Sequence, residues 1–122
     1  ALLLRDFLPL LDPQGAMALL SAKVGSIGDN RLGGWYAYRA SKAALNMLIK
    51  TASIELARRA PRARLLSLHP GTVQSALSQP FRGAAAARPA AQAARELLAV
   101  IDNGTPADSG GFFTYNGERI EW

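Results

Sequence analysis

The chain has 122 residues, a length that fits one domain but is short for an enzyme that binds a whole dinucleotide. Hydrophobic residues make up 49% of the chain and charged residues 19%, which excludes a disordered or fibrous protein. The chain has no cysteine, so disulfides, thiol catalysis and cysteine-bound metals are excluded, and its net charge of +5 comes mainly from arginines.

The first 21 residues predict a helix and a strand. Ala1–Leu11 has the spacing of a short amphipathic helix, which the following Asp, Pro and Gly end. The apolar stripe of this helix is Leu3, Leu4, Phe7, Leu8 and Leu11. Ala16–Ser21 is a continuous apolar run that predicts a buried strand. The opening ALLL run is too short to span a bilayer or to form a signal-peptide core, so we expect a soluble, cytoplasmic protein without a membrane partner.

The middle of the chain predicts a loop, a long helix and a second strand. Lys23–Gly34 is rich in glycine and reads as a loop. Trp35–Arg59 has apolar residues at helical spacing. These apolar positions are Ala40, Ala44, Met47, Leu48, Ala52 and Leu56. A proline then stops the helix, and Arg64–His69 is predicted as a second buried strand that ends at Pro70 and Gly71.

The last third of the chain predicts a flap, a helix and a short strand. The composition of Thr72–Arg88 suits a mobile flap. Pro89 is suited to the first position of a helix that runs to about Asp102, and Gly111–Tyr115 is predicted as a third strand. This alternation of helices and strands is typical of βαβ units on a parallel sheet, so the fold class is α/β.

The densest basic cluster lies where the long helix should end. Its members are Arg58, Arg59, Arg62 and Arg64. Cations are favourable at a helix C-terminus, and the aromatic residues lie elsewhere in the sequence. We therefore expect a solvated cap and no nucleic-acid partner.

The strongest chemical signal is Tyr38 followed four residues later by Lys42. This spacing puts both side chains on one face of the long helix, with Asn46 a further turn along, expected on the helix surface. A cation held beside a phenol favours the phenolate form, so the pair can act as a general acid/base. The same pair also occurs by chance in many helices, and by itself it would not identify a site.

Four segments together resemble the C-terminal half of a short-chain dehydrogenase/reductase, closest to the C-factor-like branch. They are SAKVGSIGDN, GGWYAYRASKAALNM, the HPGTVQS turn and the closing GGFFTYNG. The resemblance implies the C-terminal half of a Rossmann-type doubly wound fold, with about three parallel strands and flanking helices. Residues 1–122 would then form a single partial Rossmann-like domain.

The family resemblance also implies roles for individual residues. Tyr38 would give a proton to a substrate carbonyl as hydride arrives from a reduced nicotinamide, or take it back in the reverse reaction. Lys42 would hydrogen-bond the nicotinamide ribose and support the tyrosine. The turn at Pro70 and Gly71 would bring backbone near Val73 to the nicotinamide carboxamide, with Ser75 where the family often has Thr. Without the family, the Pro-Gly pair would read as a simple turn.

The serine that holds the substrate oxygen in the family has no exact counterpart here. The family pair Ser-Ser corresponds to Ser21 and Ala22, so the catalytic hydroxyl is missing at Ala22. Ser26 is our preferred replacement, and Ser21 stays open. The alternative for Ser26 is a serine that satisfies backbone groups of its loop.

The coenzyme-binding half of the family is absent from the chain. A dinucleotide site needs a glycine-rich turn, and no two glycines of this chain stand two positions apart. We therefore expect NAD or NADP in a completed enzyme and no coenzyme bound by this chain alone. No metal is expected, because the single histidine, His69, is better explained as packed than as ligating.

Two functions from different classes remain open at the sequence level. The first is the catalytic half of an NAD(P)-dependent oxidoreductase acting on a small carbonyl substrate. The second is a truncated module that keeps the fold and binds no dinucleotide. In either case the missing half would leave an unpaired strand edge at residues 16–21, and we expect a homo-oligomer formed through residues 1–11 and 35–59.

Overall fold

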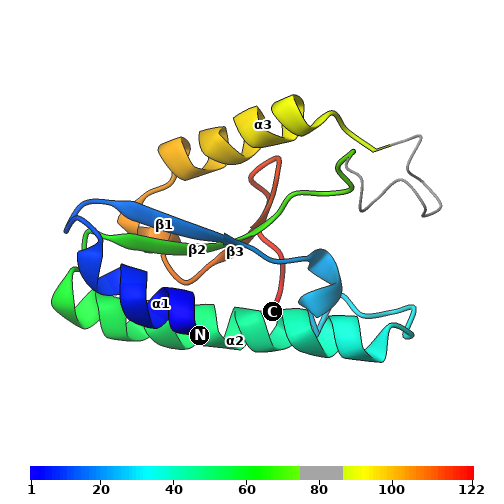
Figure 1. Cartoon of the computed structure of the whole chain (residues 1–122), viewed down its shortest axis with the longest axis horizontal. Coiled ribbons are helices and arrows are strands. Elements are labelled where there is room, and N and C mark those ends of the chain that lie inside the picture. Colours follow the sequence, from blue (N-terminus) through cyan, green and yellow to red (C-terminus); the bar gives the residue numbers. More distant parts are fainter. Residues whose placement is uncertain (75–86) are drawn as a thin grey trace.

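The computed structural model describes residues 1–74 and 87–122, which form one three-stranded sheet with helices on both faces (Figure 1). The strands are β1 (Ala16–Leu20), β2 (Arg64–His69) and β3 (Phe112–Thr114), in that spatial order and all parallel. The helices are α1 (Leu2–Phe7), α2 (Tyr36–Arg59) and α3 (Ala90–Asn103). The predicted α/β class with about three parallel strands is confirmed.

The two faces of the sheet carry separate hydrophobic clusters. Beneath α1 and α2 the cluster is built from Leu4, Leu8, Ile49, Leu56, Ala63 and Leu65. Beneath α3 it is built from Leu66, Leu68 and Phe113. Alternate residues of β2 thus point to opposite faces, as the pleat of a strand requires, and β2 is buried on both of them.

Some predicted boundaries and burial patterns were wrong. The first helix is shorter than predicted, because α1 ends at Phe7 and a 3₁₀ turn follows at Leu8–Leu10. Within its predicted stripe, Leu3 and Phe7 are exposed while Leu4 and Leu8 are buried. Pro89 is the residue before α3 rather than its first residue. The predicted flap, Thr72–Arg88, lies mostly outside the described residues.

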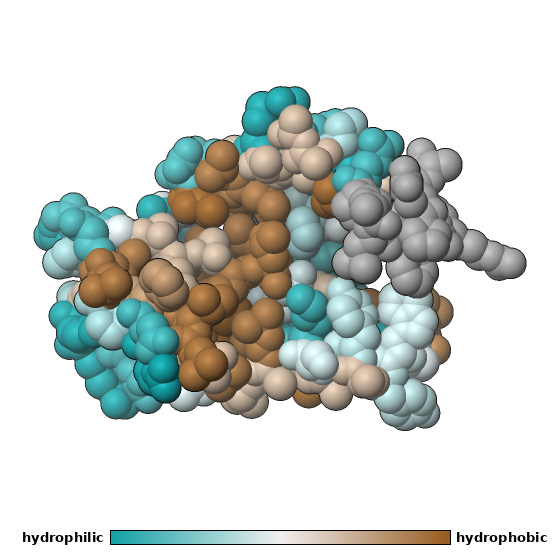
Figure 2. All heavy atoms as spheres, in the orientation of Figure 1, coloured by the Kyte–Doolittle hydropathy of each residue, from teal (hydrophilic) through white to brown (hydrophobic). Residues whose placement is uncertain are grey.

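β1 is a strand, as predicted, but it is not buried. Its first four residues are only partly covered, and Leu20 is 56% exposed. The reason is its place in the sheet: in the described part of the chain β1 pairs with β2 on one side and has no neighbour on the other. Figure 2 shows hydrophobic side chains gathered in a broad band on the face where β1 lies in Figure 1. The predicted unpaired edge is therefore present.

The predicted apolar stripe of α2 was also wrong in part. The buried face is formed by Asn46, Ile49, Ser53 and Leu56. Ala40, Ala44, Met47 and Leu48 face solvent instead, and Met47 is 67% exposed. α2 therefore carries apolar residues on two faces, of which only one meets the sheet.

The arginine cluster after α2 is more structured than a solvated cap. Arg64 donates from Nη1 to the carbonyl oxygens of Ile101 at 2.6 Å and Gly104 at 2.7 Å, at the end of α3. Arg59 donates to the carbonyl oxygen of Leu8 at 3.3 Å. Arg64 thus adds a second donor to the Ile101 carbonyl, which also accepts from the backbone N–H of Gly104 at 3.3 Å, and supplies a donor to the Gly104 carbonyl just after α3.

Candidate active site

The candidate site lies where the carboxyl ends of β1 and β2 meet the N-terminal turns of α2. After β1 the chain forms a short 3₁₀ turn, Lys23–Gly25, that rests directly on α2. A Cβ placed on Gly25 would lie 2.8 Å from both Cβ and C of Lys42, so only glycine allows this approach. The sequence thus packs the end of β1 against the helix turn that carries the lysine.

A left-handed backbone segment sets the start of α2. Gly33, Gly34 and Trp35 have φ angles of 66°, 71° and 51°, which the two glycines adopt without steric cost. Arg39 holds this segment by donating to the carbonyl oxygens of Gly34 at 3.0 Å and Gly33 at 3.1 Å. A further bond at 3.2 Å reaches the carbonyl oxygen of Val24, so Arg39 also joins the segment to the 3₁₀ turn.

Sequence reasoning did not assign a role to Arg39. It stands directly after Tyr38, at a position that the Tyr-x-x-x-Lys pattern leaves open. The signal that could have found it is an arginine in the first turn of a helix that follows two consecutive glycines, because the carbonyl groups of those glycines lie outside the helix and need other donors.

Tyr38 and Lys42 share one face of α2, as their spacing predicts. The Lys42 Nζ lies 5.9 Å from the centroid of the Tyr38 ring, and the ring is approached edge-on by Trp35 at 6.4 Å between centroids. Tyr38 is 48% exposed, so its phenol is open to an incoming molecule. The Lys42 ammonium also donates to the Leu20 carbonyl oxygen at 3.4 Å, at the carboxyl end of β1. Among the described residues this is its one hydrogen bond, so two of its three N–H groups remain for another acceptor there.

Ser26 is buried and its hydroxyl is engaged by backbone groups. Its Oγ donates to the carbonyl oxygen of Glu121 in a short hydrogen bond and accepts from the backbone N–H of Asp29 at 3.0 Å. The side chain is 1% exposed. This arrangement matches the alternative of a serine that holds its loop, here against the C-terminal segment.

Ser21 is also buried, but its hydroxyl differs from that of Ser26 in its hydrogen bonding. It directly follows β1, its backbone N–H donates to the Leu68 carbonyl oxygen at 2.8 Å, and it is buried. Its Oγ has no hydrogen-bond partner among the described residues. A buried hydroxyl without a partner is costly, so of the two serines Ser21 has the hydroxyl that is free to bind.

Asn46 is not on the helix surface, contrary to our expectation. It is 3% exposed and its Oδ1 accepts from the Ser67 hydroxyl at 2.9 Å, which joins α2 to β2 one turn below Lys42. Its Nδ2 has no partner among the described residues. The expectation failed because it counted the polarity of the side chain and not its place on the buried face of α2.

His69 ends β2 beside the site. Its Nδ1 accepts from the backbone N–H of Lys23 at 3.2 Å, which fixes the 3₁₀ turn over the sheet. Burial lowers the pKa of His69 below its ordinary value, and the nearby charges of Lys23 and Arg88 lower that pKa further. The neutral imidazole is the form whose Nδ1 can accept this hydrogen bond.

The turn after β2 brings further predicted residues to the same edge. Gly71 has a φ of 72°, and a Cβ there would lie 2.9 Å from the ring of Tyr115, so the position requires glycine. Val73 forms an isolated parallel bridge with Arg88. Ser75, also predicted to bind coenzyme, lies outside the described residues.

The donors of this edge fit one end of a dinucleotide only. Among the described residues Lys42 has N–H groups to spare, and the turn at Gly71 follows the neighbouring strand β2, an arrangement that suits a nicotinamide and its ribose. The sequence has no G-x-G turn for a pyrophosphate, since no two glycines stand two positions apart. Within residues 1–74 and 87–122 there is no cluster of side chains that could hold a metal ion, and no helix there is long and apolar enough to cross a membrane.

The chain was compared with known proteins by sequence and by structure. The chain is 41% identical over 112 residues to C-signal of Myxococcus xanthus, and covers 64% of that protein. It is 39% identical over 114 residues to 1-hydroxy-2-glutathionyl-2-methyl-3-butene dehydrogenase of Rhodococcus sp. (strain AD45), and covers 50% of it. A solved NADPH-bound carbonyl reductase from chicken fatty liver superposes with a TM-score of 0.84 at 29% identity. The match covers 99% of this chain and 52% of that structure.

The chain belongs to the short-chain dehydrogenase/reductase family. No family model matches it. The chain spans about half to two thirds of the length of the curated short-chain dehydrogenase/reductase relatives that it matches. The predicted family and the half-length correspondence are thus confirmed, and the site residues are assigned below as a proposal.

Proposed function

We propose that the chain is the catalytic half of an NAD(P)-dependent short-chain oxidoreductase that reduces a small carbonyl compound or oxidises the corresponding alcohol. The observation that carries this proposal is the Lys42 ammonium 5.9 Å from the Tyr38 ring, on a half-exposed helix face at the carboxyl edge of the sheet. A phenol beside a cation at an open edge is suited to proton transfer.

Each residue has a defined task in this reaction. NAD(P)H, when bound, supplies the hydride that adds to the carbonyl carbon. Tyr38 donates its phenolic proton to the carbonyl oxygen, which yields the alcohol and leaves a phenolate. Lys42 stabilises that phenolate through its positive charge and offers its free N–H groups to the ribose of the coenzyme. Among the described residues, Pro70, Gly71 and Val73 supply the edge that would meet the nicotinamide.

Two serines are candidates for the residue that holds the substrate oxygen. Ser26 remains the residue predicted from the sequence, but its hydroxyl already holds Glu121 and Asp29. Ser21 has a buried hydroxyl without a partner among the described residues. The comparison of Ser21→Ala with Ser26→Ala decides this: loss of turnover at unchanged stability identifies the serine that holds the substrate oxygen.

We propose further that the chain is inactive alone and needs a glycine-rich half beside β1. The free edge of β1 offers unpaired backbone groups, and the exposed hydrophobic residues of α1 and β1 are Leu2, Leu3, Phe7 and Leu20. A parallel strand added at this edge would extend the sheet and cover apolar surface.

A joined enzyme tests the proposed function. The chain would be fused behind the glycine-rich half of a solved carbonyl reductase, and NADPH binding and NADPH oxidation with an aldehyde would be measured. We expect the 122-residue chain to leave NADPH fluorescence unchanged at about millimolar coenzyme, and the joined enzyme to bind and turn over. A folded joined enzyme without turnover would contradict the proposal.

The second candidate function is an interaction module that binds no dinucleotide. The observation in its favour is the apolar band on the face that carries β1 (Figure 2), together with the lack of a G-x-G turn in the sequence. For this candidate, the joined enzyme would bind no NADPH while the chain itself would still associate. A cytoplasmic location stays a prediction for both candidates.

A further inference from the structure

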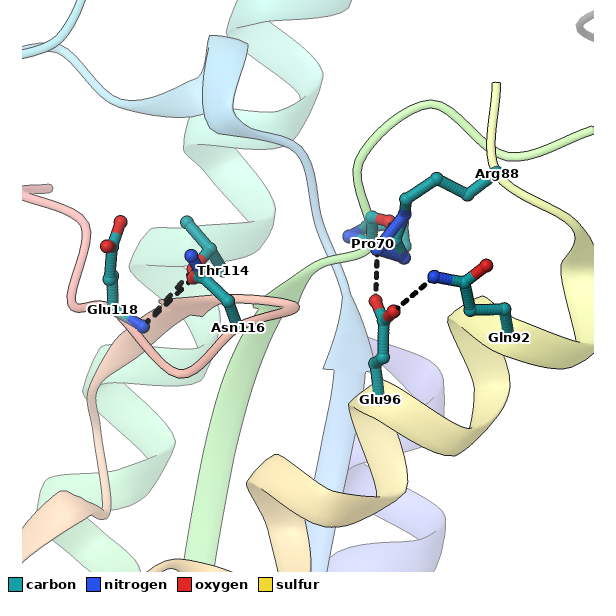
Figure 3. Close-up of polar contacts among 7 residues, drawn as sticks. All are labelled: Pro70, Arg88, Gln92, Glu96, Thr114, Asn116 and Glu118. Atoms are coloured by element: carbon teal, nitrogen blue, oxygen red, sulfur yellow. Dashed lines mark hydrogen bonds and ion pairs between the residues drawn. The ribbon is translucent and has the colours of Figure 1, made fainter. Parts of the chain in front are cut away.

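Arg88 connects three elements that are far apart in the sequence. It stands just before α3, yet its Nη2 donates to the carbonyl oxygen of Pro70 at 3.0 Å, in the turn after β2. Its Nη1 forms a short ion pair with Glu96 on α3, and its guanidinium lies 3.6 Å from the centroid of the Tyr115 ring, just after β3. Figure 3 shows Arg88 above Pro70, with Glu96 and Gln92 on the neighbouring helix face.

The backbone of Arg88 holds the same turn from the other side. Its N–H donates to the Thr72 carbonyl oxygen at 2.9 Å, and its carbonyl oxygen accepts from the N–H of Gln74 at 2.9 Å. Residues 72–74 are therefore fixed by the main chain of Arg88, and Pro70 by its side chain.

The acceptor on α3 is itself oriented. Gln92 donates to Oε1 of Glu96 at 2.8 Å, which leaves Oε2 for Arg88. The Arg88 side chain is only 17% exposed, so this ion pair is less screened than a surface pair. A planar guanidinium can stack on a ring and donate to two acceptors at once, which a lysine cannot do.

The Tyr115 ring, on which the Arg88 guanidinium stacks, also contacts the turn at Gly71. Tyr115 is the atom group nearest to Gly71, since a Cβ at Gly71 would lie 2.9 Å from its Cε1. The guanidinium holds the ring, and the ring closes one side of the Gly71 backbone. Arg88 thus constrains Gly71 through Tyr115 and Pro70 through a hydrogen bond.

We propose that Arg88 is a positioning residue that fixes the turn at Pro70 and Gly71, and so the backbone that meets the nicotinamide end of the coenzyme. Arg88 itself touches neither coenzyme nor substrate in this assignment. The part that concerns the coenzyme rests on the proposed function, whereas the effect of Arg88 on the turn does not.

The first test measures the turn without activity. Amide hydrogen exchange would be followed in the 122-residue chain for Gln74 and, as an internal reference, Ser67, whose N–H donates to Gly111 within the sheet. In Arg88→Met we expect exchange at Gln74 to be at least about tenfold faster and exchange at Ser67 to be unchanged. In Arg88→Lys the exchange rate at Gln74 should lie between those of the parent chain and Arg88→Met, because lysine keeps the positive charge and loses the planar guanidinium. Unchanged exchange at Gln74 in Arg88→Met would overturn the proposal.

The matched control is Arg95→Met. Arg95 lies on α3 like Glu96, is exposed, and has no hydrogen bond or ion pair with the described residues. The Arg95→Met substitution removes the same charge without a contact to the turn, so the exchange rate at Gln74 should stay as in the parent chain. Acceleration equal to that of Arg88→Met would also overturn the proposal.

The second test uses the joined enzyme and separates KM from kcat. We expect Arg88→Met to raise KM for NADPH about tenfold, to change KM for the aldehyde little, and to be partly rescued by Arg88→Lys. Equal effects on both KM values, or none, would refute the coenzyme part of the assignment. If the parent joined enzyme does not turn over, the proposed function fails, and the exchange experiment still decides whether Arg88 fixes the turn.

Discussion

Tyr38 and Lys42 are neighbours on α2 but are expected to act on different steps. In the joined enzyme, Tyr38→Phe removes the phenolic hydroxyl that donates the proton and keeps the ring, so turnover should fall by about 10²–10⁴-fold while NADPH affinity stays the same. Lys42→Ala should lower both turnover and affinity, because its free N–H groups and its charge are lost together. Steady-state kinetics and NADPH fluorescence titration measure the two effects.

Tyr36→Phe is the matched control for this prediction. Tyr36 is two residues before Tyr38, on another side of the helix, and is more exposed than Tyr38. Its loss should leave both quantities unchanged. Normal turnover in Tyr38→Phe would show that another group handles the proton.

The lowered pKa of His69 leads us to expect that the free energy of unfolding depends on pH. Its pKa is lowered in the folded chain, first by burial and then by the charges of Lys23 and Arg88, from an ordinary value of 6.5. The folded state therefore disfavours the proton: the contribution of His69 is full above about pH 6.5 and is lost as pH falls through the lowered folded pKa. We expect part of the loss of unfolding free energy as the pH falls below about 6.5 to come from this residue.

The variant His69→Asn isolates the contribution of His69 protonation to the loss of unfolding free energy. The amide oxygen can accept from the backbone N–H of Lys23 in place of Nδ1, and it does not titrate in this range. Urea unfolding of the two proteins across this pH range should give a shallower decline for the variant. Equal slopes would mean that protonation of His69 does not limit stability.

At the scale of single elements, Arg64 is expected to stabilise the end of α3. Its Nη1 donates to the carbonyl oxygens of Ile101, in the last turn of α3, and of Gly104, directly after it. Arg64→Met keeps the stem of the side chain and removes both bonds, so the free energy of unfolding should fall by about 1–3 kcal/mol. Denaturant unfolding measures the loss.

Arg62→Met is the control, because Arg62 is exposed and has no hydrogen bond or ion pair with the described residues. Its effect should lie within about 0.5 kcal/mol. If both variants lose the same stability, net charge rather than the cap at α3 would explain the result.

The elements also show what the sequence could predict. Strong local signals located the strands and α2 to within one or two residues, since apolar runs and proline or glycine breaks act over a few positions. The spacing of Tyr38 and Lys42 sufficed to place both on one face. Residues defined by distant partners were missed. Arg64, Arg88 and Asn46 bond to segments more than fifteen positions away, and no local pattern encodes such contacts.

α2 shows the same limit in its apolar pattern. Two apolar stripes lie on one helix, and the sequence alone does not say which stripe meets the sheet. The predicted stripe included Met47 and Leu48, which face solvent, whereas the sheet is met by a face that contains Asn46 and Ser53. Polar residues on the buried face misled the assignment because their partner, in the case of Asn46, is a serine on β2.

At the scale of the whole molecule, the exposed stripe of α2 leads to a prediction about assembly. Tyr36, Met47 and Ile54 are exposed and lie on one side of this helix. A helix with apolar residues on both sides is normally covered on both. We therefore expect the chain to form a homo-oligomer through α2, with α1 contributing Leu3 and Phe7, which are exposed as well.

Charge placed in the stripe should weaken that assembly. Met47→Glu or Ile54→Glu would bury an unpaired carboxylate in the contact, so we expect the dissociation constant to rise at least about tenfold. Leu98→Glu is the control, because Leu98 is an exposed leucine on α3, on the other face of the sheet. Sedimentation equilibrium measures the constants. A monomeric parent chain would contradict the predicted homo-oligomer. Equal weakening by all three variants would contradict assembly through α2 and would favour the free edge of β1 as the surface through which copies associate.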